Sequence, residues 1–365
     1  MLYLMKIAII GCGNISSIYL ENAALFKSFE IAYVSDLDFS RAEAQAAKYG
    51  VNALPLEDVF SSDADAILNL TIPAAHGEIA LKALEAAKHI YNEKPLATFL
   101  EEAEQMLTIA KAKNLRIGCA PDTFLGAGLQ TARAFIDAGG IGQPVGASLH
   151  MVATGPDMWH PNPSFFYQTG AGPLFDMGPY YITAMVHLFG AVKRVSAFAA
   201  QTRSTRADKA GNTFAVHVPT HVTALLEHQG GVLVTLTISF DAVKGTNKNI
   251  EIYGSKGALV INDPNNFSGA LKYSDGLGEW GNGNWHDLSI DRPYAENSRG
   301  VGLADMAQAI LENRPHRASG ELAHHVLDIM QAFHDASREG QHIELTSTCA
   351  RPAPLPLGLR PGLVE

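Results

Sequence analysis

The sequence is poor in cysteine and in positive charge. Its 365 residues include three cysteines, Cys12, Cys119 and Cys349, which are too few and too scattered for a disulfide framework. The formal net charge of −10 argues against a nucleic-acid partner and against an anionic membrane surface. The small number of cysteines predicts a protein of a reducing compartment, and we expect a cytoplasmic one.

Long apolar runs and clustered metal ligands are also missing. No segment has the uninterrupted apolar length needed to span a bilayer. The apolar start, residues 1–10, contains Lys6, lacks a small-residue cleavage end and leads directly into a glycine turn, so we expect it to be part of the fold rather than a signal peptide. His217 and His221 are separated by the helix breaker Pro219, and no metal site is predicted.

A glycine turn follows the first strand-like run. Residues 5–10 are apolar and β-branched, which is typical of a buried strand. Gly11-Cys12-Gly13 comes next, and helical spacing continues over residues 15–26. A strand, a glycine turn and a helix N-terminus are what a pyrophosphate requires, although an ordinary turn is the alternative. Ser16 replaces the usual third glycine. The residues expected to hold a dinucleotide here are Gly11, Gly13, Asn14 and Ile15.

A second strand-like run, residues 30–34, leads to Asp36. An acidic side chain at this place accepts hydrogen bonds from the ribose 2′-OH of the cofactor. A carboxylate would repel a 2′-phosphate, and the following Leu37 supplies no cation for it. The sequence therefore predicts a preference for NAD over NADP. The alternative for Asp36 is an ordinary helix-capping or turn aspartate.

The pattern of apolar runs changes near Pro121, and the length favours two domains. Before it, strand and helix patterns alternate, which predicts an α/β domain with a doubly wound parallel sheet over residues 1–121. After it, consecutive strands are expected at 144–152, 195–200, 222–227, 232–240, 249–253 and 258–261, with helices at 129–138, 302–311 and 322–333. These strands predict a large, mostly antiparallel open sheet in an α/β domain over residues 122–345. Residues 346–365 are expected to form a proline-rich tail.

Four motifs occur in a fixed order along the chain. They are Gly11-x-Gly13, Thr71-Ile72-Pro73-x-x-His76, Glu93-Lys94-Pro95 and Asp176-x-x-x-Tyr180. With them the chain resembles the Gfo/Idh/MocA oxidoreductases over nearly its whole length. The resemblance implies a Rossmann domain, then an α/β domain with an open sheet that often packs against another subunit, a nicotinamide cofactor, and sugars or polyols as substrates. It also places Thr71, Ile72, Pro73 and His76 along the cofactor, and Glu93 and Lys94 near its nicotinamide.

Tyr180 departs from many members of this family, the inositol dehydrogenases among them, which carry histidine at this place. Tyrosine here resembles the branch of glucose–fructose oxidoreductase and dimeric dihydrodiol/xylose dehydrogenases. That favours an aldose oxidised at its anomeric carbon. The alternatives are a polyol, inositol or secondary-alcohol sugar dehydrogenase, a redox-neutral lyase or isomerase with tightly held NAD, and a non-catalytic ligand sensor on the same fold.

Alcohol oxidation needs a proton acceptor and a group that stabilises the developing alkoxide. We expect Lys94 to stabilise that oxygen and to lower the pKa of a neighbouring phenol, Tyr180 to exchange the proton, and Asp176 to orient both. Each has a plainer alternative. Lys94 would be a surface lysine, Asp176 a helix N-cap with Tyr180 one turn onward, and Tyr180 a buried aromatic.

The loop after residue 154 is rich in aromatic residues. We expect Trp159, His160 and Phe165 to stack on a sugar face, with an ordinary packed loop as an equal alternative. Arg299 is expected either to reach the substrate or to form a salt bridge. A sheet face without helices would be a large apolar surface, so we expect a homodimer or homotetramer through the second domain.

Overall fold

The computed structural model describes residues 4–243, 245–276, 278 and 283–365, so Met1–Tyr3 of the apolar start lie outside the described residues. The chain divides into two compact units. Unit 1 comprises Met1–Leu125, Glu296–His324 and Leu355–Glu365, and unit 2 comprises Gly126–Ala295 and His325–Pro354. Unit 1 is therefore discontinuous, and the final segment belongs to it with Leu355 and Val364 buried.

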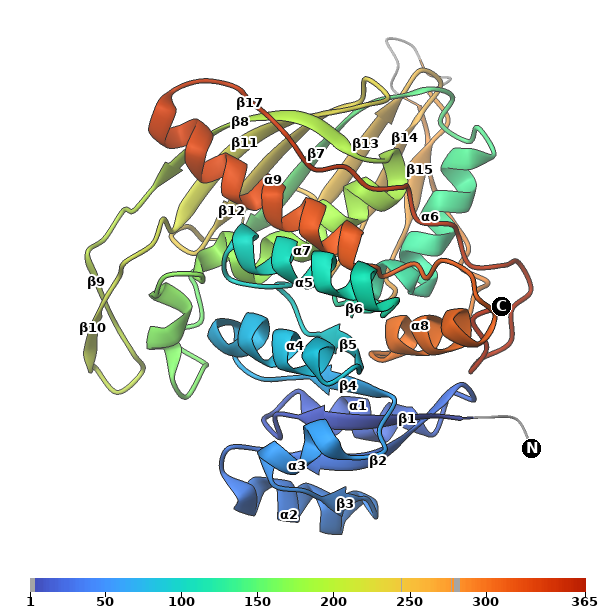
Figure 1. Ribbon diagram of the computed structural model, residues 1–365. Coiled ribbons are helices and arrows are strands. Elements are labelled where there is room, and N and C mark those ends of the chain that lie inside the picture. Colours follow the sequence, from blue (N-terminus) through green and yellow to red (C-terminus); the bar gives the residue numbers. More distant parts are fainter. Residues whose placement is uncertain (1–3, 244, 277, 279–282) are drawn as a thin grey trace. The chain divides into compact units, whose positions relative to one another are not determined.

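Unit 1 is built on a sheet of six parallel strands (Figure 1). Their order is β3-β2-β1-β4-β5-β6, so the order reverses between β1 and β4. Ligands of such sheets bind at the carboxyl ends of the strands beside this reversal. The strands are β1 (Met5–Ile10), β2 (Phe29–Ser35), β3 (Asn52–Ala53), β4 (Ala66–Asn69), β5 (His89–Asn92) and β6 (Ile117–Cys119).

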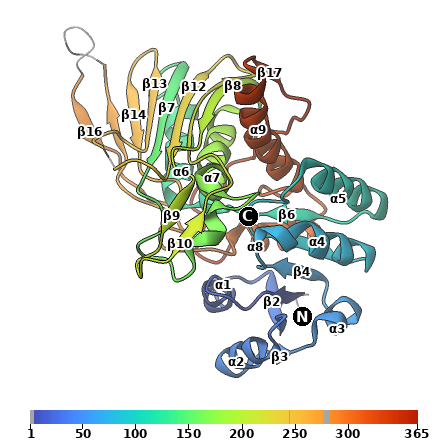
Figure 2. The same ribbon diagram turned by 90° about the vertical axis from the view of Figure 1, so that its left-hand side faces the viewer.

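Helices cover both faces of this sheet, as the alternating pattern predicts. Figure 2 shows α1 and α2 on one side and α3, α4 and α5 on the other. The second helix shows why the boundaries fall where they do: the Asp38 carboxylate accepts from the Ser40 N–H at its start, and Gly50 ends it in the left-handed conformation. The helices of unit 1 are α1 (Ser16–Ala23), α2 (Phe39–Tyr49), α3 (Leu56–Ser61), α4 (His76–Glu85), α5 (Leu100–Lys113) and α8 (Val301–Leu311).

Unit 2 contains a sheet of nine strands in the order β16-β15-β14-β13-β7-β12-β11-β8-β17. All neighbouring strands are antiparallel except β7 and β12. The expectation of a mostly antiparallel sheet is confirmed. The strands are β7 (Pro144–Val152), β8 (Val192–Ala200), β11 (His221–His228), β12 (Leu233–Ser239), β13 (Ile250–Gly254), β14 (Ala258–Ile261), β15 (Lys272–Ser274), β16 (Trp285–Asp287) and β17 (Ile343–Glu344).

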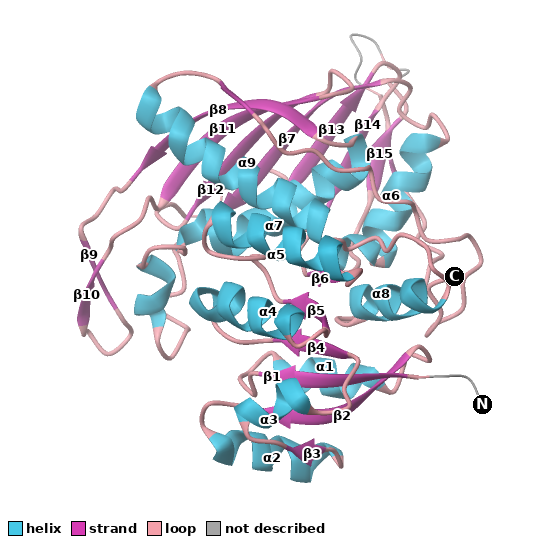
Figure 3. Ribbon diagram, viewed as in Figure 1, coloured by secondary structure: helices cyan, strands magenta, loops and turns pink. Residues whose placement is uncertain are grey.

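One face of this large sheet packs against helices. Figure 3 shows α6 (Ala127–Asp137), α7 (Gly172–Phe189) and the later part of α9 (Gly320–Glu339) on the same side of the strands. Among the described residues no helix covers the opposite face (Figure 2). That face carries apolar side chains in solvent, and Phe198 on β8 is 78% exposed, with Leu225 on β11 and Leu233 on β12 also exposed.

Two local features differ from the expectations. α7 begins at Gly172, with Ala171 as its N-cap and Pro173 in its first turn, so the interpretation of Asp176 as an N-cap is wrong. Proline fits the first helical turn because the N–H it lacks would have no acceptor there. Strands β9 (Thr205–Ala207) and β10 (Thr213–Ala215) form a separate two-stranded ribbon, which the apolar pattern of the sequence does not predict.

None of the helices within the described ranges has the length and apolar character that a membrane crossing requires.

Candidate functional site

The glycine turn after β1 is shaped by close backbone packing on one side and by open space on the other. Gly11 has φ +104°, and a Cβ there would lie 2.6 Å from the carbonyl atoms of Leu70, so only glycine fits. A Cβ on Gly13 would meet no atom within 4 Å. Ser16 is buried and donates its hydroxyl to the Gly13 carbonyl at 2.7 Å, which closes the turn where the third glycine is missing.

The first turn of α1 lies directly behind this glycine turn. Its N-cap, Ile15, makes no side-chain capping bond, and the first turn has no acidic residue. Helix N-termini of this kind bind anions through backbone N–H groups and the helix dipole. The open side of Gly13 and this uncapped end fit the pyrophosphate of a dinucleotide.

Asp36 follows β2 and contacts the same turn. Its carboxylate accepts from the Cys12 N–H at 2.7 Å and from the Asp38 N–H at 2.9 Å. The helix-capping role belongs to Asp38, while Asp36 does serve the local turn. A carboxylate has about four acceptor sites, so two backbone bonds leave capacity for ribose hydroxyls. Leu37 beside it is 93% exposed.

Two buried asparagines end the neighbouring strands β4 and β5. Asn69 and Asn92 are register partners, and the Asn69 side-chain amide donates to the side-chain oxygen (Oδ1) of Asn92 at 3.1 Å. Asn69 accepts from the backbone N–H and the hydroxyl of Thr71, at 3.2 and 2.7 Å. Asn92 donates to the Leu96 carbonyl at 2.8 Å. The amide pair therefore fixes the start of both loops that carry the remaining unit 1 motifs.

His76 joins the same two loops from within. It is buried, with Nδ1 2.6 Å from the Pro95 carbonyl and Nε2 3.1 Å from the Thr71 carbonyl. Burial lowers the pKa of this imidazole, so the neutral ring donates one hydrogen bond, and the shorter contact marks Pro95 as its acceptor. Through the bond to the Pro95 carbonyl, His76 holds the turn around Lys94 in place.

Glu93 connects the Lys94 turn to the first helix. One carboxylate oxygen accepts from the phenol of Tyr19 at 2.8 Å, and the other accepts from the Lys94 N–H at 3.0 Å. Tyr19 lies on α1 and is buried, which raises its pKa well above the usual range and keeps it a donor. Lys94 itself is partly exposed. The glycine turn, Glu93 and Lys94 thus share one edge of the parallel sheet.

Residues 5–120 match the family described as an oxidoreductase family with an NAD-binding Rossmann fold, and residues 129–260 match the GFO/IDH/MocA C-terminal domain. The chain belongs to the Gfo/Idh/MocA family. It is an NAD-binding oxidoreductase, and the resemblance expected from its motifs is confirmed.

Individual relatives of this Gfo/Idh/MocA protein are distant. It is 26% identical to the myo-inositol 2-dehydrogenase of Thermotoga maritima, over 71% of this chain and 75% of that protein. It is 25% identical to the inositol 2-dehydrogenase of Ralstonia nicotianae, over 71% and 74%. A levoglucosan dehydrogenase with NADH and L-sorbose has a TM-score of 0.81 at 21% identity, covering 95% of this chain and 100% of that one. The last likeness shows the fold alone.

In unit 2, the fourth motif lies on α7. Asp176 and Tyr180 are four residues apart on this helix and therefore share a face, one turn apart. Asp176 is partly exposed, whereas Tyr180 is 7% exposed. The two residues lie on a helix that is mostly apolar and buried.

The aromatic residues between β7 and α7 gather into a cluster of Trp159, His160, Phe165 and Phe166. Ring centroids are 4.0 Å apart for Phe165 and Phe166, 5.0 Å for His160 and Phe166, and 5.6 Å for Trp159 and His160. The rings pack on one another, yet Trp159 remains 71% exposed. The cluster is therefore an exposed aromatic surface, which we call the aromatic cluster below.

The remaining expected residues divide between the surface and local contacts. Ile72 is exposed at the start of the second motif. Arg299 donates to the Asn297 side chain at 2.8 Å, and Asn22 of α1 binds the backbone of the same segment. Across the described ranges, no group of three or more His, Cys, Asp or Glu side chains is arranged to hold a metal ion.

Sequence reasoning did not find Tyr19, Asn69 and Asn92. A signal existed for the asparagines, because each is a polar residue that ends a buried apolar strand just before a motif. Tyr19 offered none, since its partner Glu93 is far away in the sequence.

Replacing Gly13 with valine tests the dinucleotide cradle. A Cβ there would meet no atom within 4 Å, so the thermal unfolding midpoint should stay close to that of the parent protein. It would occupy the side of the turn that a pyrophosphate approaches, so NADH affinity, measured by fluorescence titration, should fall about tenfold or more. Gly230→Ala, at another open glycine, is the matched control and should leave NADH affinity unchanged. Tight NADH binding by Gly13→Val would contradict the assignment.

Proposed function

We propose that this protein is an NAD-dependent dehydrogenase that oxidises an aldose at its anomeric carbon. The observation that carries the proposal is Tyr180, one turn after Asp176 on α7. By the family resemblance, many members, the inositol dehydrogenases among them, would carry histidine at this position. The bound nicotinamide supplies the acceptor for the hydride. The protein's own residues supply orientation, charge and a route for the proton.

The cofactor preference follows from Asp36. Its carboxylate is held by the Cys12 N–H at the glycine turn, and the neighbouring Leu37 has no charge. An anion fixed at this place supports acceptance from the 2′-OH of NAD and repulsion of the 2′-phosphate of NADP.

The double variant Asp36→Ser/Leu37→Arg tests this preference. It removes the anion and adds a guanidinium that can bind phosphate with two hydrogen bonds. We expect the ratio of kcat/KM for NAD to that for NADP to fall by about tenfold or more, or to invert. Leu37→Arg alone keeps the carboxylate and should shift the ratio less. An unchanged ratio in the double variant would assign Asp36 to turn formation only.

We assign the chemical roles as follows. Lys94 stabilises the oxygen that becomes an alkoxide as the hydride leaves its carbon, because a cation favours the developing negative charge. Tyr180 takes the hydroxyl proton. An unperturbed phenol titrates near a pH of about 10, so it serves as a base only where positive charge lowers its pKa. Asp176, on the same face of α7, orients the groups around it.

Removing the phenolic oxygen of Tyr180 tests the proton route. Tyr180→Phe keeps the packing of a buried ring and should lower kcat by about 10²–10⁴-fold, the usual contribution of general acid–base catalysis. Lys94→Ala should lower kcat at least as much, and Tyr180→Phe should bind NAD as the parent does.

Tyr181→Phe is the matched control for Tyr180→Phe. It removes a phenol on the same helix whose hydroxyl accepts from Asn249 at 2.9 Å, and it should turn over at nearly the parent rate. If Tyr180→Phe turns over at nearly the parent rate, the phenol of Tyr180 is not needed for proton transfer and Tyr180 is only a packed aromatic. Lys94 is then the next candidate for the proton route.

A cyclic polyol oxidised at a secondary alcohol is the second candidate. The inositol dehydrogenases among the relatives favour it. A panel of aldoses, polyols and inositols, assayed with NAD and NADP by nicotinamide absorbance, separates the two. Higher kcat/KM with aldoses supports the first candidate, and higher kcat/KM with inositols replaces it by the second.

The uncovered face of the large sheet supports a homodimer or homotetramer. Phe198 and Leu225 are exposed on adjacent strands there, and exposed apolar patches of this kind commonly mark interfaces. Light scattering at micromolar concentration should show a dimer or tetramer, and Leu225→Lys should dissociate it. Leu311→Lys, an exposed leucine on α8 of unit 1, is the control. A monomeric parent protein would contradict the proposal.

A further inference from the structure

The aromatic cluster belongs to a loop with little regular structure of its own. Residues 154–167, the aromatic loop, contain one short 3₁₀ turn over Pro163–Tyr167. Its inner end is well packed, because Tyr167 is fully buried against Val216 and Phe240. Its outer part carries the exposed Trp159. A loop that presents side chains to solvent needs an anchor to keep one conformation.

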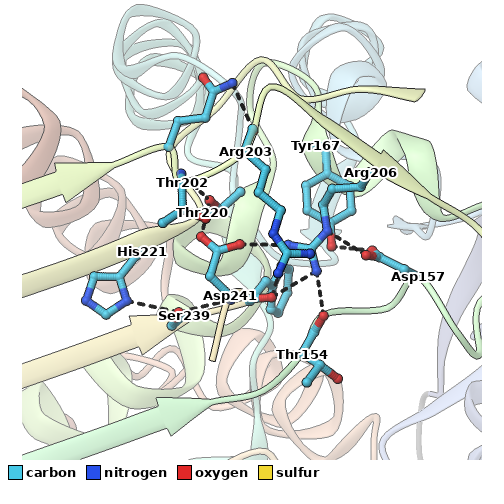
Figure 4. Close-up of polar contacts among 12 residues, drawn as sticks. Thr154, Asp157, Tyr167, Thr202, Arg203, Arg206, Thr220, His221, Ser239 and Asp241 are labelled. Carbon is cyan, nitrogen blue, oxygen red and sulfur yellow. Dashed lines mark hydrogen bonds and ion pairs between the residues drawn. The ribbon is translucent and has the colours of Figure 1, made fainter. Parts of the chain in front are cut away.

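Arg206, on the β9–β10 ribbon, supplies that anchor. Figure 4 shows its guanidinium group between Asp157, Tyr167, Asp241 and the Thr154 carbonyl. The Arg206 nitrogens lie 2.5 Å from Asp157, 2.8 Å from Asp241 and 2.6 Å from that carbonyl. The guanidinium carbon is 5.0 Å from the centre of the Tyr167 ring. The side chains of Arg206, Asp157 and Asp241 are 5%, 9% and 8% exposed.

These contacts join three segments that are far apart in the sequence. Thr154, Asp157 and Tyr167 belong to the aromatic loop, Arg206 to the ribbon, and Asp241 follows β12. The second oxygen of each carboxylate is also used, because Tyr167 donates its hydroxyl to Asp157 and Thr220 donates to Asp241. Both ends of the aromatic loop are therefore bound to a single guanidinium group and its partners.

Gly155 shows how closely the loop fits around this group. Its φ is +88°, and a Cβ there would lie 2.4 Å from the Tyr167 hydroxyl and 3.2 Å from an Arg206 nitrogen. The network also depends on the shape of arginine, whose planar fork reaches several acceptors at once, whereas a lysine ammonium is a compact point charge.

We propose that Arg206 is a positioning residue for substrate binding. It fixes the aromatic loop so that Trp159 and His160 present a preformed aromatic surface to the apolar face of a carbohydrate. The proposal rests on the proposed function, since it concerns the substrate of that reaction. A surface ordered before binding favours affinity because the ligand need not order it, and aromatic rings suit the C–H face of a sugar.

The test compares Arg206→Lys with the parent enzyme on the best sugar of the substrate panel. KM should rise about tenfold with kcat within about twofold, because the lost interaction acts on binding. NADH affinity should be unchanged. The control is Arg203→Lys, at an exposed arginine in the same segment whose charge makes no ion pair with the aromatic loop among the described contacts.

A second comparison separates positioning from general stabilisation. Trp159→Ala should raise KM on its own, and Arg206→Lys added to it should raise KM little further, because Arg206 acts through Trp159. Arg206→Lys should also change the fluorescence of Trp159, measured as the difference from Trp159→Phe, and make the aromatic loop sensitive to limited proteolysis. Additive effects on KM would overturn the proposal.

Two further outcomes are decisive. If Arg206→Lys fails to fold, Tyr167→Phe carries the same test, because it deletes only the hydroxyl that binds Asp157, and an unchanged KM in that variant overturns the proposal. If the aromatic loop of Arg206→Lys stays resistant to protease and Trp159 keeps its parental fluorescence, Arg206 does not anchor the loop. This result overturns the proposal whichever sugar is the substrate. Absence of turnover with every carbohydrate, while Arg206→Lys still frees the loop, contradicts the proposed function instead.

Discussion

The amide pair between Asn69 and Asn92 is the interaction on which the unit 1 site depends. The parallel strands β4 and β5 end side by side, and a loop follows each of them. The buried polar groups at both strand ends need hydrogen-bond partners. One hydrogen bond joins the amides, and their remaining groups bind Thr71 and Leu96. A buried polar group left unpaired costs about 1–3 kcal/mol, more than an ordinary hydrogen bond contributes, so the pair strongly favours one arrangement of both loops.

Contacts of His76 and Glu93 extend from this pair to the Lys94 turn and to α1. His76, which follows the Thr71 loop, adds a second link between the same loops by donating to the Pro95 carbonyl. Glu93 then binds Tyr19 of α1 and the N–H of Lys94, so the helix behind the glycine turn and the turn around the lysine are positioned together. The sheet edge and these contacts therefore position the backbone of Lys94.

In unit 2, charged side chains hold the aromatic loop in place. Its aromatic loop lacks ladder hydrogen bonds, and a buried guanidinium group with two carboxylates takes their place (Figure 4). Breaking such a buried pair by removing one partner typically costs about 3–5 kcal/mol. Hydrogen bonds to a guanidinium group are directional, so this network favours one conformation of the loop more strongly than apolar packing alone would. On the open face of the sheet, the exposed apolar side chains of Phe198 and Leu225 lie among polar ones, including the Arg194–Glu227 ion pair.

The sequence by itself determined the elements whose signals are local. The glycine turn, the alternation in the first 121 residues and the strands β7 and β14, with their observed bounds, follow from apolar periodicity and turn residues. The motif order also identified the family. Only the tertiary structure decided the discontinuous first unit, the β9–β10 ribbon and the partners of Arg206 and Tyr19. The ribbon is a short local hairpin without a clear apolar alternation. The first unit and the two sets of partners depend on contacts between residues tens to hundreds of positions apart, and a periodic pattern carries no information about which distant polar groups meet.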